Sequence, residues 1–252
     1  MSLINYKMEA GIGYLKFNRP DKYNAFNQDL LEELAALLRQ ESANDTLKVM
    51  IISGEGKAFS SGVDLKALLD LKTVEQARSF ALLLENTSEL IYNFPKPTIA
   101  MINGLALGGG FGYATAADIR IMSTGAKVGY PAVKLGAILP ATCTMYLKSL
   151  IGEGRTKDLL LTGRMIEAGE ALQMGLVNYT ANGSELIDKA IAIARQITEA
   201  PALALEYTKN TVNFTTKREI EAAKLYAADN FAFLSQTTEW QARMKAFANK
   251  KK

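Results

Sequence analysis

The chain of 252 residues contains no histidine and one cysteine, Cys143. Without histidine, Ser-His-Asp and Cys-His catalysis are excluded, and so is metal ligation by imidazole. A lone cysteine forms no internal disulfide and no thiolate-rich metal site, and it fits a reducing compartment. No carboxylate spacing of the calcium-loop type occurs, so we expect no bound metal.

Strong charge and long apolar runs are also lacking. The formal net charge is +3, which gives no reason to expect a nucleic-acid partner. No run of 18 apolar residues is present, so no membrane-spanning helix is expected. The first residues show no basic segment followed by an apolar one, as a secretory signal would. We expect a cytoplasmic protein with neither nucleic acid nor membrane as partner.

Short apolar segments organise the first half of the chain. Two of them, Ile4–Met8 and Tyr14–Phe17, flank a turn and predict a hairpin. Three more are each followed by glycine and a longer excursion, and they predict buried strands at Val49–Ser53, Thr98–Ile102 and Ile119–Ser123. The periodicity alone indicates an α/β protein with buried strands.

Helix signals fill the intervals and dominate the second half. Asn27 is a candidate N-cap for a helix to about Gln40, and Thr73 with Gln76 forms a capping box for a helix that ends before Pro95. Beyond residue 140 we expect helices at Ala141–Ile151, Arg155–Leu161, Glu167–Met174, Ser184–Glu199, Ala202–Asn213, Arg218–Leu234 and Glu239–Ala248.

No linker, low-complexity segment or charge block divides the chain. Thr216 and Glu219 form another capping-box pattern, which predicts a helix start near residue 217. We therefore expect one core at residues 1–195 and a C-terminal helical region at residues 196–252.

Two loops with few large side chains carry the chemical signal, Lys57–Leu65 and Asn103–Gly110. In such loops backbone N–H groups can reach a ligand, and two from different loops can hold one carbonyl oxygen as it becomes negative. A dinucleotide-binding loop is excluded because Tyr113 stands where its third glycine is required. A phosphate-binding P-loop is excluded because Gly56-Lys57 is followed by Ala58.

A set of motifs, in order and over nearly the whole chain, resembles the crotonase (enoyl-CoA hydratase/isomerase) superfamily. The motifs are Asn18-Arg19-Pro20, Asn24-Ala25-Phe26, Ala58–Leu65, Asn103–Gly110, Ala117-Asp118, Leu161-Thr162-Gly163, and Ala168 through Gly175-Leu176-Val177. The resemblance implies a crotonase-like ββα spiral core with a C-terminal trimerisation region, assembled as a homotrimer or a dimer of trimers. It also implies an acyl-CoA substrate, with coenzyme A as part of the substrate and no separate cofactor.

The resemblance assigns site residues as well. The two backbone amides of the family's oxyanion hole fall on Val63 and Gly109. Positions that match the family's substrate and CoA contacts are Lys22, Ala25, Ser61, Asp64, Leu65, Gly110, Pro131, Phe231 and Lys250.

The chain departs from the family where catalytic carboxylates are usual. These positions hold Gly112, Ala132 and Pro140. General acid–base help is worth about 10²- to 10⁴-fold per group, so hydration by two glutamates is not supported. The possible polar replacements nearby are Tyr130, Lys134 and Thr142.

Three hypotheses remain open. The first is an acyl-CoA enzyme for hydration, isomerisation or decarboxylation that uses the oxyanion hole with an unusual acid–base set. The second is a non-catalytic CoA-ester-binding homologue. The third is a protein that uses the same fold for a ligand without CoA.

Overall fold

The structure is a computed structural model that describes residues 2–249, with the backbone alone for residues 215–219, 221 and 222. Its larger sheet has six strands in the order β1-β2-β3-β5-β7-β10. β1 and β2 are antiparallel, whereas the other neighbours are parallel. The strands are β1 (Ile4–Glu9), β2 (Ile12–Phe17), β3 (Val49–Gly54), β5 (Thr98–Ile102), β7 (Ile119–Ser123) and β10 (Tyr179–Ala181). The predicted hairpin and the three predicted buried strands are confirmed.

A second sheet of four short strands has the order β4-β6-β8-β9. Its strands are β4 (Ala58–Ser60), β6 (Leu105–Leu107), β8 (Lys127–Gly129) and β9 (Met165–Glu167). Each of β3, β5 and β7 is followed along the chain by a short strand of this second sheet. That alternation is the ββα spiral that the resemblance implied.

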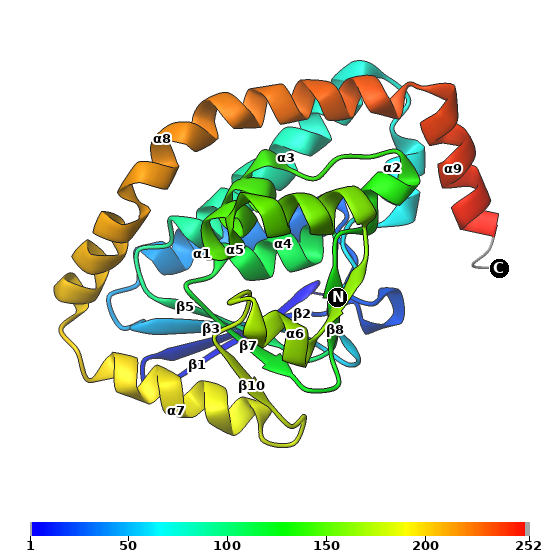
Figure 1. Ribbon diagram of the computed structural model, residues 1–252. Coiled ribbons are helices and arrows are strands. Elements are labelled where there is room, and N and C mark those ends of the chain that lie inside the picture. Colours follow the sequence, from blue (N-terminus) through cyan, green and yellow to red (C-terminus); the bar gives the residue numbers. More distant parts are fainter. Residues whose placement is uncertain (1, 250–252) are drawn as a thin grey trace.

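Helices cover the sheets on both sides (Figure 1). α7 (Leu186–Thr198) packs its apolar residues against one face of the larger sheet, in a cluster with Val49, Ile51 and Ile99. A larger apolar cluster unites the opposite face with the second sheet and with the helices that precede α7. These helices are α1 (Gln28–Ser42), α2 (Leu65–Asp70), α3 (Val74–Tyr92), α4 (Gly109–Ala116), α5 (Ala141–Thr162) and α6 (Ala168–Gln173).

The predicted caps of α1 and α3 are confirmed. The Asn27 side chain accepts a hydrogen bond from the Leu30 amide, and Thr73 and Gln76 exchange both bonds of a capping box. Two short 3₁₀ turns, η1 (Pro20–Lys22) and η2 (Pro131–Leu135), form parts of the loops around the site.

The C-terminal region differs from the expectation in one respect. Residues 202–235 form one helix, α8 (Ala202–Ser235), so the prediction of a helix start near residue 217 is wrong. The backbone continues helically because α8 lies along α3, and this packing outweighs a local capping signal (Figure 1). α9 (Thr238–Asn249) follows. The domain boundary expected at residues 195/196 falls in the last turn of α7 and stays a prediction.

Two other segments refine the helix predictions. α5 contains a kink at Gly152, where φ is +77°, between the two helices expected there. The helix expected at Glu167–Met174 begins after β9, as α6. Across residues 2–249, no helix is both long enough and apolar enough to cross a bilayer.

Candidate active site

A cavity of about 1310 Å³ lies between the N-terminal loop (residues 18–27), the two glycine-bearing loops (residues 57–65 and 103–110) and the C-terminal helices. Apolar side chains from distant parts of the chain form much of its wall, among them Leu68, Leu84, Leu139, Phe231 and Met244. A cavity that is mostly apolar with a few polar groups is typical of a small-molecule site, and this one is large enough for an extended ligand.

The first glycine-bearing loop follows β4 and is held by the N-terminal loop. The Ser61 amide donates to the Tyr23 carbonyl at 2.9 Å, and the Phe26 amide donates to the Gly62 carbonyl at 2.7 Å. Gly62 has φ +91°, and a Cβ there would lie 2.7 Å from the Leu107 carbonyl oxygen, so only glycine allows this approach. The loop is therefore fixed beside the strand that carries the second loop.

The second loop runs from β6 through Gly108 into α4. The Gly108 amide donates to the Gly129 carbonyl at 2.9 Å, which holds the turn, and Gly109 is the first residue of α4. An ideal Cβ on Gly109 would lie 4.0 Å from Cγ2 of Val63. The two loops thus meet, and both Val63 and Gly109 line the cavity.

The amides of these two residues are not used by the fold. Within residues 2–249, neither the Val63 N–H nor the Gly109 N–H donates to another protein group. The Gly109 amide lies at the N-terminus of a helix, where the helix dipole favours negative charge. The geometry is therefore suited to a negatively charged or strongly polarised oxygen.

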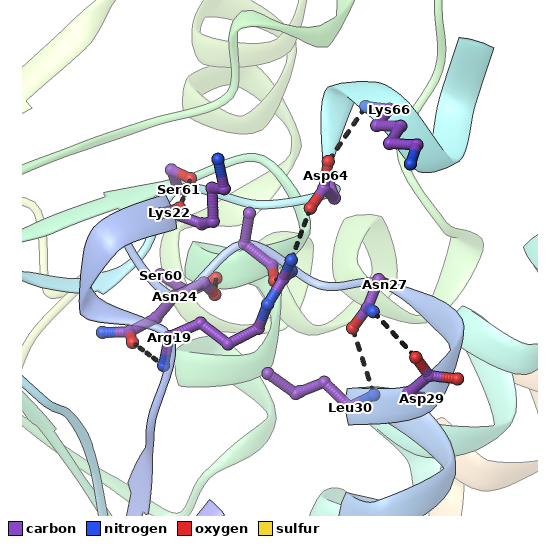
Figure 2. A network of polar contacts seen from close by, with 11 residues as sticks. Arg19, Lys22, Asn24, Asn27, Asp29, Leu30, Ser60, Ser61, Asp64 and Lys66 are labelled. Carbon is purple, nitrogen blue, oxygen red and sulfur yellow. Dashed lines mark hydrogen bonds and ion pairs between the residues drawn. The ribbon is translucent and has the colours of Figure 1, made fainter. Parts of the chain in front are cut away.

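Arg19 joins the N-terminal loop to the first glycine-bearing loop (Figure 2). Its guanidinium forms an ion pair with Asp64 at 2.8 Å and donates to the Ala25 carbonyl. The second Asp64 oxygen accepts from the Lys66 amide at 2.9 Å and caps α2. Both side chains of the ion pair are 15% exposed, so the pair is well shielded at the rim of the cavity.

Most residues predicted for the site meet at this cavity. Those that line it are Lys22, Ala25, Ser61, Val63, Asp64, Leu65, Gly109, Pro131 and Phe231. Gly110 is buried behind the loop, where a Cβ would overlap Ser60. Lys250 lies outside the described residues.

The positions without the usual carboxylates are near the cavity, but the possible replacements do not line it. Ala132 and Pro140 are part of the wall, whereas Gly112 is packed against Cys143. Tyr130 is buried against Phe111, with 5.2 Å between ring centroids. Neither Tyr130, Lys134 nor Thr142 is among the described residues of the cavity wall. Burial raises the pKa of the Cys143 thiol well above its usual range, so this thiol is not activated as a nucleophile.

One buried carboxylate in the cavity wall was not predicted from the sequence. Glu85 of α3 lines the cavity and is only 1% exposed. Its two oxygens accept hydrogen bonds from the amides of Ala141 and Thr142, at 2.6 and 3.0 Å, and from the Thr142 hydroxyl at 2.7 Å. Burial raises its pKa, and the three hydrogen bonds oppose that shift. The available signal was a charged residue on the apolar face of an amphipathic helix, one turn after Ala81.

The spiral of paired strands and the cavity between two glycine-bearing loops define the class: a crotonase-fold protein with a small-molecule site. The comparisons identify the family. The model of the enoyl-CoA hydratase/isomerase family matches residues 7–252, and the chain belongs to this family.

Relatives match over nearly the whole length. The chain is 33% identical over 245 residues to the short-chain-enoyl-CoA hydratase of Clostridium acetobutylicum, covering 97% of this chain and 94% of that protein. It is 35% identical over 245 residues to the crotonyl-CoA hydratase of Syntrophomonas wolfei, with the same coverage. A crystal structure of an enoyl-CoA hydratase/isomerase from Xanthobacter autotrophicus superposes with a TM-score of 0.91 at 29% identity, covering 98% of this chain and 93% of that one.

Proposed function

We propose that this protein is an acyl-CoA enzyme that stabilises a thioester enolate between the backbone amides of Val63 and Gly109. The observation that carries the proposal is the pair of amide donors, unused by the fold, on two loops that meet at one cavity wall. Donors held in place before the reaction stabilise the charge that develops on the thioester oxygen. Membership of the family and the printed names of the relatives support the acyl-CoA substrate.

Coenzyme A would enter past the N-terminal loop. Lys22 offers a cation there, and Ala25 and Ser61 line the same cavity. Phe231 of α8 offers an apolar surface in the same cavity. No separate cofactor is part of the proposal.

The reaction is double-bond isomerisation, decarboxylation or hydration without the usual glutamates. Gly112 and Ala132 offer no carboxylate, so water activation by two glutamates has no counterpart here. Isomerisation and decarboxylation need fewer proton-transfer groups than hydration, and the site favours them.

The alternative is a non-catalytic CoA-ester-binding homologue. The lack of a carboxylate at Gly112 and Ala132 favours this alternative as well. Calorimetric titration with acyl-CoA thioesters, followed by turnover assays with enoyl-, malonyl-type and aryl-CoA substrates, separates the two. Turnover of any of these supports the enzyme. Binding without turnover across the set supports the homologue, and absence of binding contradicts both.

Self-association is a further part of the proposal. α8 carries exposed apolar side chains, among them Tyr207, Val212 and Tyr226, at 66%, 72% and 75% exposure. Exposed apolar residues on one element are a common sign of a protein interface. A homotrimer or a dimer of trimers would cover them, and light scattering at several protein concentrations measures the mass.

A further inference from the structure

Four carboxylates occur among the described residues of the cavity wall, and their surroundings differ. Asp21 and Asp70 are exposed to solvent. Asp64 is committed to Arg19 and to the N-terminus of α2. Glu85 is the buried one, and it faces the cavity from α3, beside Leu84 and Pro140. A carboxyl shielded from water at the wall of an apolar cavity is suited to proton transfer.

The hydrogen bonds to Glu85 stabilise its charged form and hold it in a fixed place. Its oxygens accept from the first two amides of α5, where the helix dipole favours a negative charge. The hydroxyl of Thr142 adds a third hydrogen bond at 2.7 Å. Because a hydroxyl can also accept a hydrogen bond, the Thr142 hydroxyl can turn to accept one from the acid form of Glu85. Both protonation states therefore have a hydrogen-bonding partner.

The charged and titratable neighbours leave the carboxyl able to change its protonation. Tyr113 of α4 and the residues Cys143 and Tyr146 of α5 interact with it, and burial raises the pKa of all three, so they stay neutral. Lys224 of α8 lowers the pKa of Glu85, but this ammonium pairs with Glu89 of α3. Burial outweighs these contributions and raises the pKa of Glu85 above its usual range.

We propose that Glu85 is the residue that moves the substrate proton in this active site, and that it replaces the carboxylates absent at positions 112 and 132. The inference rests on the function proposed above. The carboxylate takes a proton from the carbon next to the thioester carbonyl. The electron pair of that C–H bond forms the enolate double bond, and the carbonyl π electrons move to the oxygen held by the amides of Val63 and Gly109.

The carboxylic acid of Glu85 then returns a proton to carbon. Return of the same proton to the original carbon regenerates the substrate, whereas return to the γ carbon of a 3-enoyl thioester moves the double bond into conjugation. In D₂O the carboxyl of Glu85 exchanges its proton for a solvent deuteron while the substrate is an enolate, so return to the α carbon leaves deuterium there and releases the substrate proton to solvent. Atoms and charge balance in each case, and only the exchange needs water. The substrate class is an acyl-CoA with a hydrogen on its α carbon. Thr142 is a positioning residue because it holds the carboxyl and does not line the cavity.

Exchange in D₂O tests the inference without knowledge of the natural acyl group. Phenylacetyl-CoA and butyryl-CoA serve as probes, and mass spectrometry measures deuterium at the α carbon. The wild-type protein is expected to bind at least one probe and to exchange its α proton. Glu85→Gln is expected to bind with a similar Kd and to exchange at least about 100-fold more slowly. Glu75→Gln, an exposed residue on the same helix, is the matched control and should exchange at the wild-type rate.

A second pair of variants covers the case in which Glu85→Gln does not fold. The exchange rate should rise with pH as Glu85 loses its proton. Thr142→Val removes a hydrogen bond that lowers the pKa of Glu85, so its profile should move to higher pH. Thr142→Ser keeps the hydroxyl and should keep the wild-type profile. A purely structural role for Thr142 would change stability without moving the profile.

The outcomes separate this inference from the proposed function. Suppose that the wild-type protein exchanges the α proton and that Glu85→Gln exchanges it at a rate within about threefold of the wild-type rate. This result would overturn the role of Glu85 but would leave the enolate chemistry intact. Binding of a probe by the wild-type protein without exchange would also overturn that role. If the wild-type protein binds neither probe, the proposed acyl-CoA function itself fails.

Discussion

At the contact between α4 and α5, Cys143 fills the space that a side chain at Gly112 would need. A Cβ built on Gly112 would overlap the Sγ of Cys143 and would lie 2.8 Å from its Cβ. The usual glutamate at position 112 is therefore incompatible with the cysteine that faces it. The loss of the carboxylate and the close approach of the two helices are one structural feature.

The first prediction follows from that contact. Gly112→Ala should lower the free energy of unfolding by about 1–3 kcal/mol because it overpacks the core. Gly112→Glu should be worse and should not restore hydratase activity, whereas pairing it with Cys143→Gly should recover part of the stability. Denaturant unfolding measures each variant. Gly154→Ala, an exposed helical position with nothing within 4 Å of the added Cβ, is the control and should be neutral or slightly stabilising.

The second prediction concerns the Gly109 amide. Gly109 is the first residue of α4, a position at which proline is tolerated, so Gly109→Pro removes the N–H with little effect on the helix. Loss of one such donor should lower kcat by about 10²- to 10³-fold. Gly109→Ala keeps the N–H, and its Cβ would make an ordinary contact with Val63 at 4.0 Å. Equal rates for the two variants would argue against this amide as a donor to the substrate.

The third prediction separates two roles of Asp64. Asp64→Asn keeps an oxygen to cap α2 but loses the ion pair with Arg19, and it should cost about 1 kcal/mol of stability. Asp64→Ala loses the cap as well and should cost about 2 kcal/mol. Glu55→Ala breaks the exposed ion pair with Lys16 and should stay within about 0.5 kcal/mol of wild type. Indistinguishable unfolding curves for Asn and Ala at position 64 would mean that the cap contributes nothing.

The fourth prediction concerns recognition of coenzyme A. Lys22→Ala should weaken binding of an acyl-CoA by about 3- to 10-fold, in keeping with the loss of one charge-assisted contact. The deficit should shrink as salt is added, because salt screens exposed charges. Lys48→Ala removes an exposed cation that is not among the cavity-lining residues and should bind like wild type. A Lys22→Ala protein with unchanged affinity at low salt would remove Lys22 from the CoA site.

The long strands of the fold were predictable, and the short ones were not. β3 and β5 are buried along their whole length, and a short apolar run followed by glycine indicates such a strand. β4, β6 and β8 have three residues each, too few to show a period. Their pairing depends on the return of the chain to the same place in successive turns of the spiral, which is a tertiary effect.

The candidate site also has a part that was predictable from the sequence and a part that was not. Glycine motifs mark loops whose backbone can approach a ligand, and the resemblance to the family assigned the two amides to Val63 and Gly109. The structure brings both residues to one cavity wall. Glu85 is 24 residues from Gly109 in sequence and belongs to a different helix, so no motif connects them. Its burial and its contact with the start of α5 depend on how α3 packs against that helix.

The most direct test of the central claim is the infrared carbonyl band of a bound acyl-CoA, with a ¹³C label at the thioester carbon. Donation by the amides of Val63 and Gly109 should move this band to lower frequency in the wild-type protein and in Gly109→Ala, and the shift should be reduced in Gly109→Pro. A carbonyl band at its solution frequency in the wild-type complex, or the same shift in all three proteins, would contradict the account.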